Sequence, residues 1–162
     1  MNKLLRIIAL LTLMGILLTG CSLLGEKEYT CQELTLTVPG YMSDVSNDSS
    51  FKDFTFALDS YKIAIFGIKE PKADFEGTIV EDLEDYAAIL IEGNELDCEA
   101  KERSGGDYLY FTYEASSSGT VYGYICAAYE TKDAYWLIQV AAEEDKFDEA
   151  DFLEILDTAV FG

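Results

Sequence analysis

The stretch "GGDYLYFTYEASSSGTVYGYICAAYETKDAYWLIQVAAE" (residues 105–143) decides the fold. Three segments within it, 108–115, 120–130 and 135–143, are rich in aromatic and β-branched residues and tend to alternate in polarity. This pattern is typical of β-strands, and links of only a few residues can join strands only as antiparallel hairpins. The sequence therefore predicts an antiparallel meander.

The two links predict how these strands pair. "SSG" (117–119) suits a three-residue hairpin loop with Gly119 in the left-handed conformation, and "KD" (132–133) suits a two-residue turn. The predicted pairs are Thr112 with Tyr124, Tyr110 with Cys126, and Tyr129 with Trp136. One face is then apolar: Leu109, Phe111, Tyr113, Ile125, Ala127, Tyr129, Trp136, Ile138 and Val140. The other face carries Tyr108, Tyr110, Tyr122, Tyr124, Tyr135 and Gln139.

Further strands are expected before and after a helix in the sequence. Alternating or apolar runs at 33–39, 54–59, 61–70 and 95–103 predict strands. Between the last two, Thr78 and Glu81 have the spacing of a capping box, and a helical apolar face follows that ends near Gly93. That face comprises Leu83, Tyr86, Ala87 and Leu90.

A second helix is expected at the end of the chain, with Asp145 as its N-cap. Its apolar face comprises Phe147, Ala150, Leu153, Leu156 and Val160. The order of elements predicts an α+β fold, in which two main helices flank an antiparallel sheet as an α/β/α sandwich. We expect residues 34–162 to form this single domain.

The first twenty residues predict a secretory signal peptide. Lys3 and Arg6 precede a twelve-residue apolar run, which is shorter than the roughly twenty residues that span a bilayer. An uncleaved short anchor is the less favoured alternative. The run ends in "LTGC" (18–21), which resembles the lipobox of bacterial lipoproteins. The resemblance implies cleavage before Cys21 and attachment of lipid to its thiol, and two acyl chains hold a domain stably on a membrane.

Residues 21–33 are then expected to form a lipidated N-terminus and a short tether, whose extended reach is about 40 Å at most. The whole chain carries 11 basic and 31 acidic residues, a net charge of −20, and loss of the signal peptide makes it more negative still. A basic surface is needed to bind nucleic acid, so nucleic acid is not expected as a partner. The same charge opposes flat contact with anionic lipids.

Catalytic and metal-binding motifs give weak signals. The chain has no histidine, which excludes Ser-His-Asp catalysis and histidine-ligated zinc. The oxygens of Asp44, Ser46 and Asp48 suggest a calcium loop, but Ser49 and Thr55 stand where an EF-hand needs glycine and glutamate. We therefore predict no catalytic residue, metal site or cofactor. Cys31, Cys98 and Cys126 allow either one disulfide or none.

Three other features have a functional and a structural interpretation. The acidic run 143–151 could bind a cation, although acids also suit the start of a helix. Glu114 beside Tyr122 is the least arbitrary choice for carboxylate-based hydrolysis. The five tyrosines 108, 110, 122, 124 and 135 are the tentative binding face, for a glycan or a peptide, unless a helix covers them.

The order of elements resembles the PsbP/DcrB-like superfamily. The features that carry the resemblance are "LTLTVPGYMSD", "FALDSYKIAIFGIKE", the helix that follows Thr78, "GGDYLYFTYEA", "YICAAYETKDAYWLIQVAA" and the final helix. They cover most of residues 29–161 and are patterns of core and turn. The resemblance implies an accessory or assembly role beside larger membrane complexes. We therefore expect a non-enzymatic lipoprotein, anchored through Cys21 on the extracytoplasmic side of the cell membrane, that acts through a protein partner. The alternative is a module that binds a glycan or a cation.

Overall fold

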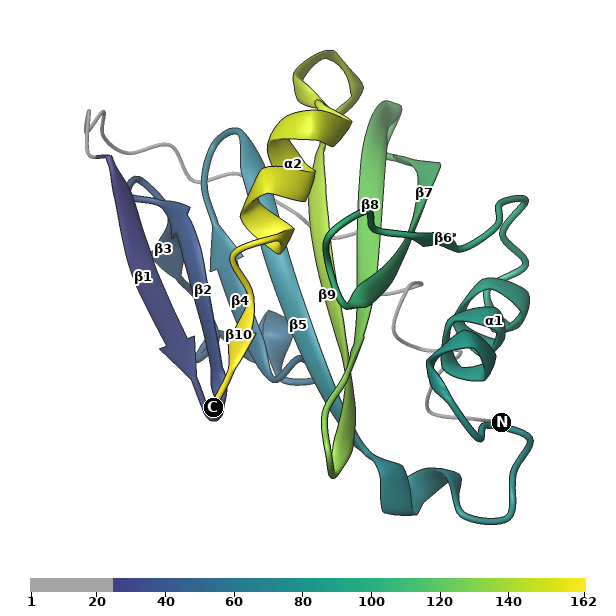
Figure 1. Ribbon diagram of the computed structural model, residues 1–162. Helices are drawn as coiled ribbons and strands as arrows, with labels where there is room; N and C mark the ends of the chain where they lie inside the picture. Colours follow the sequence, from purple (N-terminus) through teal and green to yellow (C-terminus); the bar gives the residue numbers. More distant parts are fainter. Residues whose placement is uncertain (1–24) are drawn as a thin grey trace.

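The computed structural model describes residues 25–162, and Figure 1 shows their arrangement. The strands are β1 (Glu26–Cys31), β2 (Leu34–Pro39), β3 (Ser43–Asp44), β4 (Phe56–Asp59), β5 (Ile63–Pro71), β6 (Lys101–Glu102), β7 (Tyr108–Ser117), β8 (Thr120–Glu130), β9 (Ala134–Glu143) and β10 (Val160–Phe161). The α-helices are α1 (Leu83–Gly93) and α2 (Glu149–Leu156), and short 3-10 helices span Ser49–Phe51, Lys72–Phe75 and Glu144–Lys146.

Seven strands form the central sheet, in the order β3-β4-β5-β9-β8-β7-β6, and every neighbouring pair is antiparallel. The predicted meander of β7, β8 and β9 is confirmed. The turn at 132–133 pairs Tyr129 with Trp136 as predicted. Strand β8 runs from Thr120 to Glu130, the residues that the alternation in the sequence indicated.

The first turn of the meander differs from the prediction. Ser118 and Gly119 both have positive φ, 52° and 85°, so the loop has two residues and Ser117 pairs with Thr120. Two positive φ values are typical of a type I′ hairpin turn, whose twist matches that of the strands. Tyr113, instead of Thr112, therefore lies opposite Tyr124. A shift of one residue moves the side chains of β7 to the other face of the sheet.

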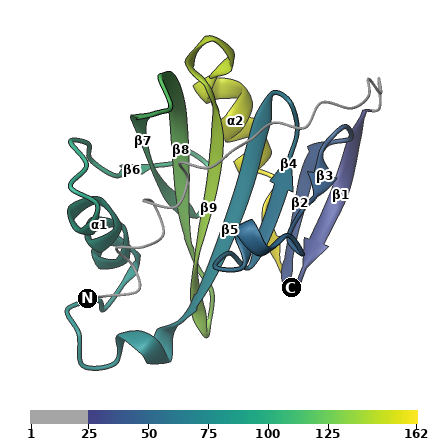
Figure 2. The ribbon, with the colours of Figure 1, turned by 180° about the vertical axis from the view of Figure 1, so that it is seen from behind.

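Helix α1 covers the β7-β8-β9 part of one face of the central sheet (Figure 2), and the segment 45–54 covers the part of that face formed by β4 and β5. Its buried residues Tyr86, Ala87, Leu90 and Ile91 pack on β7, β8 and β9. The predicted apolar face is confirmed. The predicted capping box is wrong: Asp82 is the N-cap and accepts a hydrogen bond from the Asp85 N–H, while the Thr78 hydroxyl donates to the Phe75 carbonyl.

The opposite face is covered by two elements, α2 and a second sheet of three strands in the order β1-β2-β10. Leu34, Leu36 and Val38 of β2 are fully buried against the central sheet. The expected tether therefore ends earlier than predicted, because residues 26–31 form β1 and pair with β2 along their whole length. The folded domain begins no later than Glu26.

The C-terminal helix is shorter than predicted. Asp148, and not Asp145, is its N-cap and accepts hydrogen bonds from the N–H groups of Ala150 and Asp151. Phe152, Leu153 and Leu156 are buried, whereas Ala150 is exposed and Val160 lies in β10. The strand predicted at 95–103 is also reduced to the two residues of β6.

Helices lie on both sides of the central antiparallel sheet, so the α+β fold with two flanking main helices is confirmed. Within residues 25–162, no helix has the length and apolar character needed to cross a membrane. The predicted signal peptide and Cys21 lie outside the described residues.

Candidate functional site

The five tyrosines of the predicted binding face do not share a face. Tyr108 lies opposite Tyr129 and Tyr110 opposite Ala127, on the side of the sheet that faces α2. Tyr124 and Tyr135 lie on the side of α1. Tyr122 lies opposite Ala115, also on that side. The cause is the two-residue turn, because the predicted three-residue loop would have put all five together.

Most of these tyrosines serve the core. Tyr135 stacks on Tyr86 of α1 with 4.6 Å between ring centroids, which matches the alternative that a helix covers the face. Tyr124 stacks on Tyr113 at 4.7 Å, and burial raises its pKa to about 12. The Tyr108 hydroxyl donates to Asp157 at 2.6 Å. Tyr108, Tyr124 and Tyr135 are all buried.

The acidic residues that could have bound a cation accept local hydrogen bonds instead. Asp44 accepts hydrogen bonds from the N–H and hydroxyl of Ser46, and Asp48 accepts one from the Ser50 N–H. These bonds lower the pKa of Asp44. Asp148 caps α2. Within the described part of the chain, no group of three or more histidine, cysteine, aspartate or glutamate side chains is placed to hold a metal ion.

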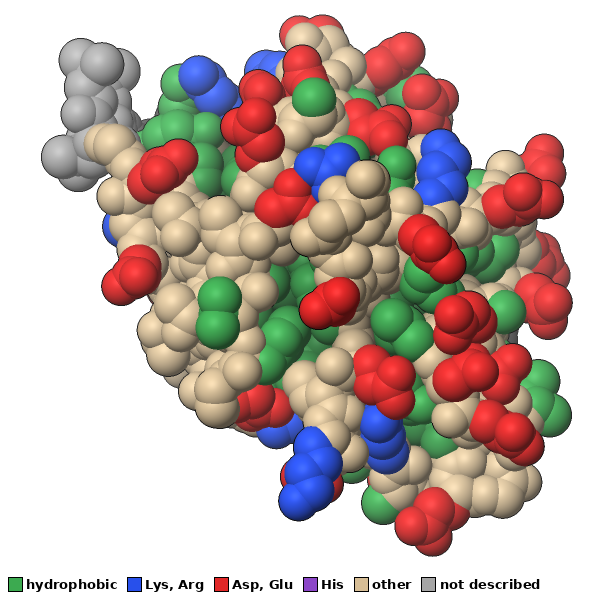
Figure 3. All heavy atoms as spheres, viewed as in Figure 1, with side chains coloured by type: hydrophobic (Ala, Val, Ile, Leu, Met, Phe, Trp, Pro, Cys, Tyr) green, Lys and Arg blue, Asp and Glu red, His purple; other side chains and the backbone are tan. Residues whose placement is uncertain are grey.

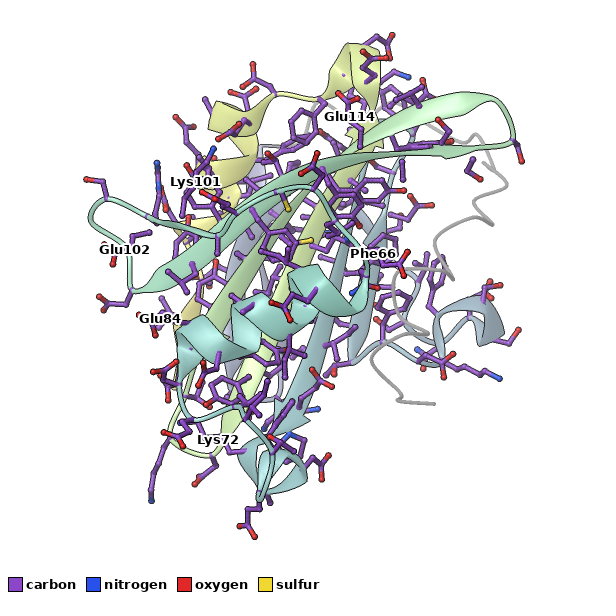
Figure 4. All side chains as sticks on the ribbon, turned by 90° about the vertical axis from the view of Figure 1, so that its right-hand side faces the viewer. Phe66, Lys72, Glu84, Lys101, Glu102 and Glu114 are labelled. Atoms are coloured by element: carbon purple, nitrogen blue, oxygen red, sulfur yellow. The ribbon has the colours of Figure 1, made fainter. Side chains whose placement is uncertain are left out.

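Glu114 and Tyr122 are not neighbours on one face. Glu114 lies opposite Gly123, and Tyr122 lies opposite Ala115, so the two side chains point to opposite sides of the sheet. Figure 4 looks onto the α1 side and labels Glu114 near the upper end of β7. The pairing that suggested carboxylate-based hydrolysis depended on the same wrong register.

The described cysteines are all free thiols. Cys126 is buried and accepts a hydrogen bond from Gln139 Nε2 at 3.3 Å. The same amide nitrogen donates to the Tyr113 hydroxyl at 2.5 Å. Burial raises the pKa of the thiols of Cys31, Cys98 and Cys126, so they remain protonated at neutral pH.

A groove of about 510 Å³ opens where α2 and the small sheet meet over the central sheet. Its floor is apolar: Val38 of β2, Ile63 of β5 and Phe152 of α2 are buried, and Ile155 is half-buried. Ligand sites of proteins are typically concave, largely apolar and of about 300–1,000 Å³. The groove has this size and character.

One rim of the groove is aromatic and basic. Tyr41 and Lys62 line the groove, and Tyr61 lies beside its lining. The rings of Tyr41 and Tyr61 have centroids 6.3 Å apart, and Lys62 Nζ lies 5.9 Å and 5.3 Å from the two rings. Tyr61 is 55 % exposed, one of three large apolar or aromatic side chains that are this exposed in residues 25–162. Among these residues no carboxylate forms an ion pair with Lys62.

The other rim is acidic. Glu26 of β1 and Asp151 and Glu154 of α2 line the groove, and none of them forms an ion pair within the described chain. Lys146 also lines it but is paired with Glu143 and Asp145. Figure 3 shows acidic side chains over α2, with apolar and basic side chains to the left, beside the start of β1.

The edge of β2 that faces the groove offers no free strand-pairing groups. The Thr37 N–H donates to the Thr158 hydroxyl at 2.9 Å, and this hydroxyl donates to the Ile155 carbonyl. Pro39 has no N–H, and its carbonyl accepts from the Met42 N–H. A ligand in the groove would therefore be recognised through side-chain contacts, and not as an added strand.

No local pattern in the sequence indicates this groove. Its lining comes from five separated segments, at 26, 37–41, 62–63, 146 and 151–158. The only local signal was the pair Tyr61-Lys62, an aromatic residue and a cation at the tip of a hairpin, and that signal alone is common on protein surfaces.

Comparisons with known proteins show the fold. No protein-family model matches the chain, and no curated protein matches it in sequence. The solution structure of cyanobacterial PsbP (CyanoP) from Synechocystis matches with a TM-score of 0.53 and 12% identity, over 90% of this chain and 97% of that one. A crystal structure from Bacteroides thetaiotaomicron matches with a TM-score of 0.56 and 12% identity, over 85% of this chain. This chain spans 48% of that protein's length. The fold is therefore PsbP-like, as the order of elements predicted.

Proposed function

We propose that this protein is a non-enzymatic lipoprotein of the cell envelope, anchored through lipid on Cys21 at the extracytoplasmic side of the membrane. Its groove binds an exposed segment of a protein partner. The observation that carries the proposal is the groove itself, which is apolar at its floor and charged on both rims.

The position of the groove supports a partner held at the same membrane. Glu26 lines the groove and is the first residue of β1, five residues after Cys21. Five extended residues span at most about 18 Å. The groove therefore opens within that distance, plus its own width, of the anchored thiol, where the membrane-proximal segments of other envelope proteins lie.

The test is a cross-linking pull-down from native membranes with the lipidated protein as bait. Ile155→Ser and Tyr41→Ser change the apolar floor and the aromatic rim of the groove, and Ile79→Ser is the matched control. Ile79 is 74 % exposed and is absent from the groove lining. We expect the first two variants to lose a specific partner that the control retains. A partner retained by all three variants would contradict the proposal.

The anchor has a separate test. Cys21→Ser removes the thiol that would carry the lipid, so we expect an uncut precursor or a protein that is released from membranes. Labelling with a radioactive fatty acid provides the readout. Normal labelling of Cys21→Ser would contradict the anchor at this residue and leave the groove untested, so the two parts of the proposal fail separately.

A further inference from the structure

We propose that the segment bound in the groove is basic and apolar, with lysine or arginine side chains on the acidic rim and an apolar side chain on the floor. This inference rests on the proposed function and names the chemistry of the partner. It follows from the charges along the groove, because the three carboxylates without ion-pair partners outnumber the single such lysine.

The acidic rim includes two neighbouring carboxylates of α2. Asp151 and Glu154 are three residues apart on α2 and therefore lie on one face of the helix, above one another. Both are exposed, and Ile155 beside Glu154 reaches the apolar floor. Glu26 adds a third carboxylate from the small sheet, where it lies opposite Pro39. A cation on the bound segment could contact this rim while its neighbour packs against Phe152 and Ile155.

The charge of the whole chain acts in the same direction. A net charge of −20 attracts cationic segments over a distance of about a Debye length, roughly 8 Å at physiological salt. The overall charge has no sequence preference, so specificity has to come from the groove. There, Lys62 is held between Tyr41 and Tyr61 and repels a second cation, which directs the basic side chains of the partner to the α2 rim.

The direct test measures binding of three labelled heptapeptides to the lipidated protein in phosphatidylcholine nanodiscs, with empty nanodiscs as the blank. The peptides alternate lysine with leucine, lysine with serine, or glutamate with leucine. Fluorescence anisotropy at 150 mM salt gives Kd. We expect the lysine-leucine peptide to bind at least tenfold more tightly than either of the others, because only it matches both the rim and the floor.

Two double variants locate the site. Asp151→Asn/Glu154→Gln removes the rim charges, and Glu84→Gln/Glu92→Gln removes two exposed charges of α1 as the matched control. Exposed ion pairs contribute about 0.2–1 kcal/mol each, so the rim variant should weaken binding of the lysine-leucine peptide about three- to tenfold. We expect the control to change it by less than about 1.5-fold, since Glu84 and Glu92 contribute only to the general charge.

The outcomes separate this inference from the proposed function. Equal weakening by both double variants, or equal binding of the lysine-serine peptide, would show attraction to the general charge and overturn the inference. Preference for the glutamate-leucine peptide, or no binding of any peptide, would also overturn it. In each of these cases the pull-down with Ile155→Ser and Ile79→Ser still decides whether the groove binds a protein partner.

Discussion

The two faces of the central sheet are covered in different ways. Helix α1 and the segment 45–54 cover the first face. The aromatic residues under α1 pack on one another: Phe75, Tyr86 and Tyr135 have ring centroids 4.6–5.7 Å apart. Two elements share the second face, the eight-residue α2 and the three-stranded sheet. The groove lies along the line where they meet. Aromatic rings fill the space under the cover of the first face, whereas the junction of α2 with the small sheet leaves a groove on the second.

The largest difference between the two sides should appear on truncation of apolar side chains. Phe111 is fully buried on the α1 side, so Phe111→Ala should lower the free energy of unfolding by about 3–5 kcal/mol. Ile155 is half-buried at the groove, where solvent already reaches it, so Ile155→Ala should lower the free energy of unfolding by only about 1 kcal/mol. Urea unfolding of both variants measures this difference. Equal losses would contradict looser packing at the groove than under α1.

The next largest effect concerns a buried carboxylate on the α1 side. The Tyr86 hydroxyl donates to Glu70 Oε2 at 2.8 Å, and Tyr86 is fully buried. Tyr86→Phe leaves this carboxylate without its donor and should cost about 1–3 kcal/mol at neutral pH. Tyr110→Phe is the control, because Tyr110 is half-buried on the other side and lies near Lys101, and it should change stability by less than about 0.5 kcal/mol. A larger loss from Tyr110→Phe than from Tyr86→Phe would contradict this difference.

The turn between β7 and β8 places each tyrosine on its side of the sheet, so changing it tests the assignment of the faces. Alanine at Gly119, where φ is 85°, should cost about 1–2 kcal/mol. Ser118→Asn should be neutral or slightly stabilising, since asparagine tolerates the left-handed conformation and Asn-Gly is a preferred type I′ pair. NMR contacts between Tyr113 and Tyr124 report the register. Contacts between Thr112 and Tyr124 would instead support the three-residue loop.

This turn also shows what the sequence could and could not reveal. Alternation located β7, β8 and β9, and the apolar spacing located α1, because both depend on neighbours in the chain. "SSG" did not distinguish a two-residue from a three-residue loop, since Ser118 gives little sign that it will adopt φ of 52°. That single residue decided whether the tyrosines formed a binding face.

The C-terminal region shows a second limit of sequence reasoning. Helical spacing continued to Val160, but pairing of β10 with β2 and the contact of Thr158 with Thr37 end the helix at Leu156. Both interactions join segments about 120 residues apart. The groove arises from the same long-range arrangement, so no local pattern in the sequence could have predicted it.

The smallest expected effect is on the pH dependence of stability, to which a carboxylate on each side of the sheet contributes with opposite sign. The hydrogen bond from Arg103, together with that from Tyr108, lowers the pKa of Asp157 on the α2 side. Stability from this group is present above its unfolded pKa, about 3.9, and is lost as the pH falls through the folded value. Burial raises the pKa of Glu70 on the α1 side, so stability is lost as the pH rises above its unfolded pKa, about 4.3, through the folded value.

Urea unfolding of Asp157→Asn and Glu70→Gln between pH 3 and pH 8 checks this pair. The deficit of Asp157→Asn relative to the unchanged protein should shrink on acidification. The unchanged protein should lose stability relative to Glu70→Gln as the pH rises. If both differences changed in the same direction with pH, the opposite pKa shifts of Asp157 and Glu70 would be contradicted.

We expect the α2 side of the sheet to bind a partner through the groove and the α1 side not to bind it. Paired photo-cross-linking distinguishes the two sides. A benzophenone amino acid replaces Tyr61, beside the groove residue Tyr41, in one variant and Ile79, near α1, in the other. Both positions are exposed. After irradiation of intact cells, we expect a discrete cross-linked species from position 61 that disappears when Ile155→Ser is added. We expect no such species from position 79. The same species from position 79, or its persistence with Ile155→Ser, would contradict binding of the partner in the groove.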